Sequence, residues 1–101
     1  MRVLVVEDET NVSQFIKKGL EEKTFQVDVA YDGYTGKRLA MQNDYDIILL
    51  DINIPQINGL ELCRIIREEK ISTPILIAKI ITRVIRSNSP PDRPYIAYLR
   101  L

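Results

Sequence analysis

The chain has 101 residues and a mass of 11.7 kDa, which is enough for one domain. Its 14 basic and 14 acidic residues give zero net charge, which argues against a nucleic-acid-binding protein driven by bulk charge. No apolar run approaches the roughly 18 residues of a membrane span, and we expect no secretory signal. One cysteine, Cys63, and no histidine exclude an internal disulfide and most zinc sites. We therefore expect a small cytoplasmic domain, without a membrane partner, whose chemistry depends on carboxylates.

Apolar runs of two kinds alternate along the first 78 residues. Short β-branched runs predict strands, and apolar residues three and four apart predict helices. In chain order we expect a strand at 3–6, a helix capped by Thr10 or Asn11, a strand at 25–29 near a sheet edge, a helix at 34–43, and then a strand at 46–51, a helix at 60–70 and a strand at 74–78. The first helix has an apolar face that we expect to point inward, made of Val12, Phe15, Ile16, Gly19 and Leu20. This order predicts an α/β fold with a doubly wound parallel sheet.

Three carboxylates follow buried strands of this sheet. Glu7 and Asp8 end the first strand, and Asp51 ends the third. Because the carboxyl ends of parallel strands meet at one edge, we expect these side chains to converge. Like charges about 4 Å apart repel by about 4 kcal/mol at an effective dielectric near 20, so a raised pKa or a bound cation must compensate. Oxygen ligands without His or Cys suit Mg²⁺, beside which an Asp can attack phosphorus. The alternative is a solvated acidic group without a function.

The composition changes after residue 78. Residues 1–78 carry nine basic and 13 acidic side chains, whereas residues 79–101 carry five basic and one acidic. We treat 79–101 as an atypical basic C-terminal segment that is partly disordered or rearranged, with an unrelated origin such as a reading-frame shift or a fused tail. Within it, 80–86 fits either a short helix or a continuation of the fourth strand, and 95–101 fits either a further strand or no regular structure.

Several segments of residues 1–78 together resemble the receiver domain of two-component response regulators. They are MRVLVVEDE at 1–9, IILLDINIP at 47–55, NGLELCR at 58–64 and TPILI at 73–77. Within the family, the chain looks most like receivers attached to winged-helix DNA-binding domains. The resemblance implies a receiver core at 1–78 with the flavodoxin-like strand order 2-1-3-4. It also implies that the usual fifth strand and last helices are missing or replaced.

The resemblance implies that Asp51 is the phosphoacceptor of a phosphorelay and takes a phosphoryl group from a sensor histidine kinase. Implied ligands of the Mg²⁺ cofactor are the carboxylates of Glu7, Asp8 and Asp51 and the backbone carbonyl of Asn53, while Pro55 and Gly59 match the loop that shapes the pocket. Such a domain is not an enzyme, and at most it phosphorylates itself at Asp51 with Mg²⁺. We expect no direct nucleic-acid binding by this chain.

The chain departs from the family pattern at its end. Lys79 stands where the family has a Ser or Thr, and it could contact the phosphate or extend into solvent. A missing last helix would expose apolar sheet beside the first helix. We therefore expect the chain either to be marginally stable or to be stabilised by self-association through the sheet edge or face, or by its own tail. The alternative function is a non-phosphorylated pseudo-receiver that acts as a protein–protein interaction module. A Mg²⁺ phosphatase is disfavoured, because Asn53 stands where the general acid would be.

Overall fold

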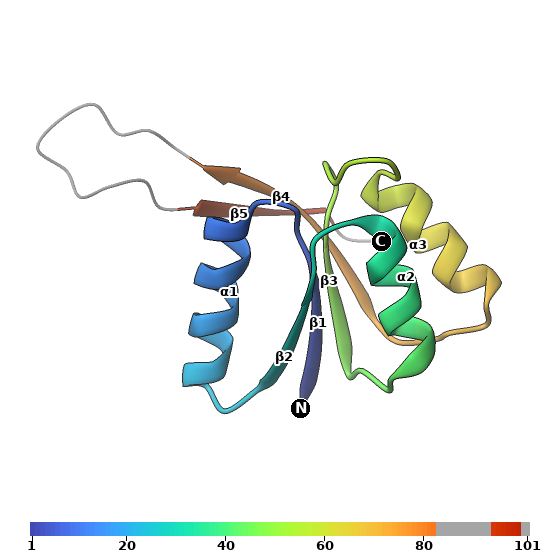
Figure 1. The fold of residues 1–101 in the computed structure, drawn as a ribbon, viewed down its shortest axis with the longest axis horizontal. Helices are drawn as coiled ribbons and strands as arrows, with labels where there is room; N and C mark the ends of the chain where they lie inside the picture. Colours follow the sequence, from blue (N-terminus) through green and yellow to red (C-terminus); the bar gives the residue numbers. More distant parts are fainter. Residues whose placement is uncertain (83–93, 100–101) are drawn as a thin grey trace, which may run out of the picture.

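The chain forms a single five-stranded sheet with helices on both faces. The computed structural model describes residues 1–82 and 94–99, with side chains up to Ala78. In chain order the elements are β1 (Arg2–Val6), α1 (Thr10–Glu22), β2 (Gln26–Ala30), α2 (Gly33–Gln42), β3 (Ile47–Asp51), α3 (Gly59–Glu68), β4 (Ile75–Thr82) and β5 (Pro94–Leu99), shown in Figure 1. The sheet order is β2-β1-β3-β4-β5, and β1 to β4 are parallel. The predicted order 2-1-3-4 and the doubly wound architecture are confirmed.

The neighbouring strands β1 and β3 are apolar except for Arg2 at the start of β1 and Asp51 at the end of β3, because both faces of the sheet are covered. Helix α1 lies on one face, and α2 and α3 lie on the other (Figure 1). Along β1 the side chains alternate between the two layers, so that Leu4 and Val6 pack toward α2 and α3 while Val3 and Val5 pack toward α1. This double burial explains why the strands appear in the sequence as unbroken apolar runs rather than as alternating ones.

Several boundaries and side chains differ from the sequence-based prediction. Phe15, which we expected on the inward face of α1, is 56% exposed, because it lies at the margin of a narrower apolar stripe centred on Val12 and Ile16. The prediction that Thr10 or Asn11 caps α1 is also wrong, since Glu9 holds the cap position and Thr10 is already helical. Helix α3 ends at Glu68 rather than at residue 70. Lys70 adopts a φ of 61°, which no right-handed helix accommodates.

The segment after Ala78 continues β4. The strand runs through Thr82, so the helix alternative is wrong for residues 80–82, and residues 83–86 lie outside the described part of the chain. β5 then pairs with β4 in the antiparallel sense, from Leu99 opposite Ile77 to Pro94 opposite Thr82. Of the two alternatives for 95–101, the strand is therefore correct through Leu99. This antiparallel strand occupies the sheet position after β4.

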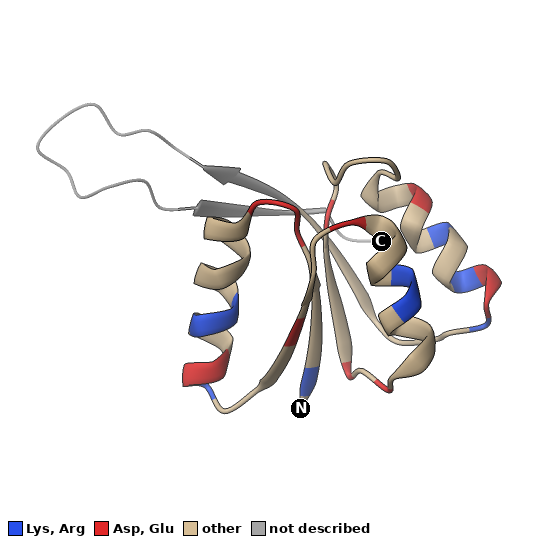
Figure 2. Cartoon of the chain, in the orientation of Figure 1, with Lys and Arg blue, Asp and Glu red and all other residues tan. Residues whose placement is uncertain are grey.

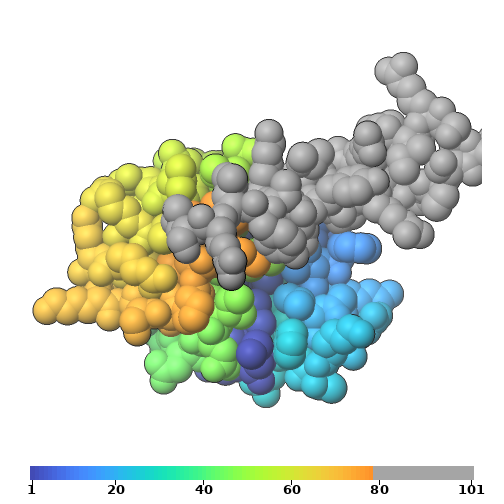
Figure 3. Space-filling model, turned by 180° about the vertical axis from the view of Figure 1, so that it is seen from behind, coloured from blue at the N-terminus to red at the C-terminus, as the bar shows by residue number. Residues whose placement is uncertain are grey.

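The face that carries α1 has a hollow lined by apolar side chains. Figure 3 shows the molecule from behind, with β4 in orange on one side, α1 in blue to cyan on the other and the N-terminal end in dark blue between them. The hollow has a volume of about 240 Å³ and is lined by Met1, Val3, Ile16, Leu20, Phe25, Ile47, Leu49 and Leu76. It lies where the prediction of exposed apolar sheet beside the first helix places it. None of the described helices is both long and apolar enough to cross a membrane.

Candidate phosphoacceptor and metal site

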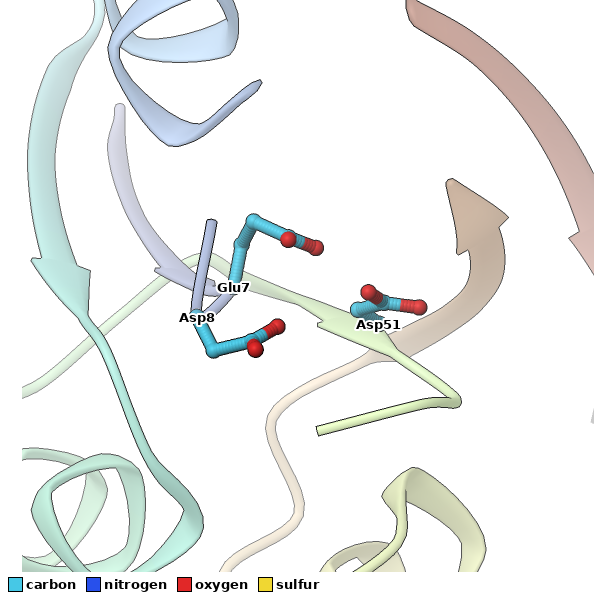
Figure 4. Close-up of side chains that lie close together, drawn as sticks. All are labelled: Glu7, Asp8 and Asp51. Carbon is cyan, nitrogen blue, oxygen red and sulfur yellow. The ribbon is translucent and has the colours of Figure 1, made fainter. Parts of the chain in front are cut away.

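The pairing of β1 with β3 brings the three predicted carboxylates together. Val6, the last residue of β1, lies opposite Leu50 in β3. The residues that follow these two, Glu7 and Asp51, therefore lie side by side at the carboxyl edge of the sheet. One carboxylate oxygen from each of Glu7, Asp8 and Asp51 lies within 4.8 Å of the others. Figure 2 shows acidic residues at the ends of both strands, and Figure 4 shows the side chains of Glu7 and Asp8 extending toward Asp51.

Glu7 is an acidic side chain held almost entirely out of solvent. It is 2% exposed, and its Oε1 accepts a hydrogen bond of 3.0 Å from the backbone N–H of Glu9. Its Oε2 is buried and receives no hydrogen bond from any described donor. Burial, first of all, and the neighbouring Asp51 and Asp8 together raise the pKa of Glu7 to about 9, although the hydrogen bond from the Glu9 N–H acts to lower it. The buried Oε2 therefore requires either a proton or a cation.

Asp51 is fixed by hydrogen bonds from the backbone N–H groups of the two residues that follow it. The side chain is buried, and its Oδ1 accepts a hydrogen bond of 3.1 Å from the backbone N–H of Asn53. The next residue, Ile52, donates its backbone N–H to the carbonyl oxygen of Ala78 in β4 at 2.9 Å. The strand end therefore holds the Asp51 carboxylate in place beside Glu7.

The loop after β3 turns back sharply to begin α3. Gln56 has a φ of 72° and lies at the centre of a tight turn in which the N–H of Ile57 donates to the carbonyl oxygen of Pro55 at 2.8 Å. Asn58 then caps α3, since its side-chain oxygen accepts the N–H of Glu61 at 2.9 Å. The N–H of Gly59 donates to the carbonyl oxygen of Ile52 at 3.0 Å. The predicted loop residues Pro55 and Gly59 therefore belong to a turn that is anchored to the strand carrying Asp51.

The chemistry of this donor set suits a hard divalent cation. All three side chains offer carboxylate oxygens, and no ion pair to a Lys or Arg joins any of them among the side chains that the structure describes. Mg²⁺ prefers oxygen ligands and keeps several waters, so three carboxylates, of which Asp8 is exposed, suit it. A cation here would compensate the repulsion between the carboxylates and remove the need for a proton on Glu7.

The remaining predicted residues lie around this edge. Asn53 is exposed two residues after Asp51. Lys79 directly follows Ala78, which is the β4 partner of Asp51, and it pairs with Ala97 in β5. The side chain of Lys79 lies outside the described part of the chain, so its predicted contact with a phosphate stays a prediction.

The sequence-based reasoning missed two features that hold the site. One is the backbone N–H of Glu9, which no residue pattern marks as a donor to Glu7. The other is the contact of Gly59 with the strand end, where an added Cβ would lie 2.7 Å from the carbonyl oxygen of Asp51. The Asn-Gly pair at 58–59 signals a turn, but it does not reveal that close approach.

Comparisons with known proteins agree with this geometry. The family model described as the response regulator receiver domain matches residues 3–84. A protein named response regulator ArlR from Staphylococcus saprophyticus is 50% identical over 76 residues, which cover 75% of this chain and 34% of that protein. The ArlR of Staphylococcus aureus strain Mu50 is 46% identical over 76 residues, with the same coverage. The chain thus spans about one third of the length of these relatives.

Solved structures of receiver domains are similar in fold. The receiver domain of the Francisella response regulator 1452 has a TM-score of 0.75 and 34% identity, over 86% of this chain and 69% of that one. The response regulator TrrA from Thermotoga maritima, solved in complex with Mg²⁺-BeF, has a TM-score of 0.68 and 36% identity, over 75% of this chain and 64% of that one. The receiver domain of the sensor histidine kinase PA1611 from Pseudomonas aeruginosa was solved with a coordinated magnesium ion. It has a TM-score of 0.72 and 29% identity, over 75% of this chain and 64% of that one.

Proposed function

Because this chain belongs to the response regulator receiver domain family, we propose that it accepts a phosphoryl group on Asp51 from the phosphohistidine of a sensor histidine kinase. A carboxylate oxygen of Asp51 attacks phosphorus, the P–N bond to the histidine breaks, and the ring nitrogen of the kinase takes the bonding electron pair. The product is an acyl phosphate on Asp51. The absence of histidine from this chain is consistent with the step, since the donor residue belongs to the kinase.

The observation that carries this proposal is the buried Glu7 carboxylate beside Asp51. A buried carboxylate with one oxygen that receives no hydrogen bond from a described donor is costly to fold unless a cation or proton occupies the site. The cost is greater here because an oxygen of this carboxylate lies within 4.8 Å of oxygens of both Asp8 and Asp51. Bound Mg²⁺ would supply neutralisation of the charge on the transferring phosphoryl group. Glu7, Asp8 and Asp51, with the backbone carbonyl of Asn53, would hold it.

The other residues of the edge position the acceptor. The N–H of Asn53 fixes one oxygen of Asp51 and so limits the rotation of the carboxylate. Pro55 and Gly59 keep the following loop close to the end of β3. Lys79, one residue after the β4 partner of Asp51, would contact the phosphoryl oxygens. The lone Cys63 is buried and free, which is consistent with a cytoplasmic site of action.

Binding of beryllofluoride tests the proposal, because beryllofluoride with Mg²⁺ imitates an acyl phosphate. We expect saturable binding to the intact chain, measured by the change in the amide spectrum of residues 50–59, and loss of that binding in Asp51→Asn. Asp44→Asn, a change at an exposed acid outside the site, is the matched control and keeps full binding. Absence of saturable binding to the intact chain would overturn the proposal and favour the pseudo-receiver. The observation on the side of the pseudo-receiver is Lys79, which stands where the family has a Ser or Thr.

A further inference from the structure

Four of the six residue pairs between β4 and β5 lie beyond the rest of the sheet. β3 pairs with β4 only from Ile75 to Ala78, whereas β5 pairs with β4 from Ile77 to Thr82. Residues 79–82 of β4 therefore have a strand partner only in β5 among the described residues, and Figure 1 shows this two-stranded ribbon extending away from the parallel strands. A ribbon of two strands is marginally stable in water, and a third strand is usually needed.

The outer edge of β5 is open along its whole length. β5 is the last strand in the sheet order, so in the described part of the chain its six residues pair only on the side facing β4. Edge strands are usually protected against further pairing by charged residues, by internal proline or by bulges. The β5 sequence PYIAYL has no charged residue, and its proline stands at the first position, while the opposite edge strand, β2, carries Asp28. The open edge of β5 is thus a template for another strand.

We propose that a second copy of this chain adds to that edge, with the two β5 strands pairing antiparallel about a two-fold axis. With the axis between Ile96 and Ala97, all six residues of each strand are paired. Tyr95 is then opposite Tyr98 of the partner subunit, and aromatic cross-strand pairs favour such a register. The two ribbons become one of four strands in the order β4-β5-β5-β4, within a continuous sheet of both copies. Such an interface is isologous and closes as a dimer.

A second copy is the occupant that the edge itself favours. When two copies pair through β5, the backbone N–H and C=O groups at the outer edges of both ribbons gain hydrogen-bond partners, and the same segment serves both copies. The apolar hollow beside α1 has a volume of only about 240 Å³, which is room for one or two side chains and not for a strand of a partner. The dimer is independent of phosphoryl transfer, because the contact involves β5 and none of the carboxylates of the site.

The test combines a measurement of molecular mass with charged substitutions in β5. Sedimentation velocity of the whole chain over a wide concentration range is expected to give a dimer with twice the mass of 11.7 kDa. The double variant Tyr95→Lys/Tyr98→Lys places like charges opposite each other across the two-fold axis. Within the chain these positions pair with Ile81 and Ala78, which are uncharged. We expect this change to weaken dimerisation by about tenfold or more.

A charge-reversed partner makes the test specific. Tyr95→Glu/Tyr98→Glu is expected to be monomeric alone and to form a mixed dimer with the lysine variant, whereas Gln26→Lys on the opposite edge strand leaves the dimer unchanged. A chain that stays monomeric at all concentrations, or a dimer that persists equally in both double variants, overturns the proposal. Hydrogen exchange of the backbone amides of residues 95–99 in the unmodified chain must slow as concentration rises. Exchange that is independent of concentration overturns it as well, whatever the folding of the variants.

Discussion

Gly59, the first residue of α3, lies against the backbone of Asp51 so closely that no side chain fits between them. A Cβ at Gly59 would be 2.7 Å from the carbonyl oxygen of Asp51 and 2.8 Å from Cα of Ile52. Both are backbone atoms, which cannot rotate away as a side chain can. The start of α3 is thus packed directly onto the strand end that carries the Asp51 carboxylate.

Gly59→Ala should therefore damage both stability and the site. The added methyl group must displace α3 or the end of β3, and overpacking of this kind costs about 1–3 kcal/mol. We expect urea denaturation to show this loss and beryllofluoride affinity to fall with it. Gly19→Ala is the matched control, because nothing lies within 4 Å of a Cβ there and alanine in a helix is more stable than glycine by about 0.5–1 kcal/mol. Equal stability and equal affinity in Gly59→Ala and the unmodified chain would contradict this packing.

The stability of the metal-free chain should fall as pH rises, because of Glu7. Burial and the neighbouring acids raise the pKa of Glu7 from 4.5 to about 9. The native state therefore holds a proton that the unfolded state has lost, so the stabilising contribution is complete below pH 4.5 and is lost progressively up to about pH 9. Denaturation in EDTA across this range is the measurement.

Glu7→Gln is the variant that isolates this contribution. The amide keeps the size of the side chain and cannot ionise, so the metal-free variant should be more stable than the unmodified chain at pH 8 and closer to it at pH 5. Added Mg²⁺ should stabilise the unmodified chain and reverse the order. Parallel stability curves for the two proteins from pH 5 to 9 would show that Glu7 does not titrate as its surroundings indicate.

Asp32→Ala should weaken the start of α2 without changing the site. One oxygen of Asp32 accepts the backbone N–H of Thr35 at 2.7 Å, and this bond lowers the pKa of Asp32. Loss of such a cap costs about 1 kcal/mol. Because the pKa is lowered, the contribution is present above the unfolded-state value and fades as pH falls, so the difference should shrink in acid. Asp44→Ala, at an exposed acid, is the control, and an equal effect of the two changes would rule out the cap.

Tyr45→Phe should destabilise the opposite end of the sheet. The Tyr45 hydroxyl donates to Oδ2 of Asp28 at 2.7 Å, and the guanidinium of Arg2 lies 5.2 Å from the centre of the tyrosine ring. Removal of the hydroxyl loses one hydrogen bond to a charged group, worth about 1.5–3 kcal/mol, while the buried ring remains. Tyr34→Phe, at a residue 62% exposed, is the control. Thermal denaturation that does not separate the two variants would contradict the contribution of this bond.

The carboxylate site could be predicted because it depends on strand ends alone. Two unbroken apolar runs identify β1 and β3, and the rule for parallel sheets then places Glu7 and Asp51 at one edge. The contact between Gly59 and Asp51 could not be predicted, since it depends on the angle at which α3 leaves the loop. The exposure of Phe15 was missed for a similar reason, because helical periodicity identifies an apolar stripe and not its margin.

The end of the sheet was the least predictable part of the fold. A short apolar run such as Ile80–Ile81 has no periodicity that separates a strand from a helix, and only its pairing with β5 decides the matter. The antiparallel direction of β5 is a matter of its pairing with β4, which the residue pattern leaves open. Pairing between segments is a property of the folded sheet rather than of either segment.

The central claim is that Glu7, Asp8 and Asp51 together hold one Mg²⁺ ion, and calorimetric titration with Mg²⁺ tests it most directly. The account predicts a single saturable site in the intact chain and affinity lower by about tenfold or more in each of Glu7→Gln, Asp8→Asn and Asp51→Asn, with Asp44→Asn unchanged. No saturable binding in the intact chain, or equal affinity in all four variants, would contradict it.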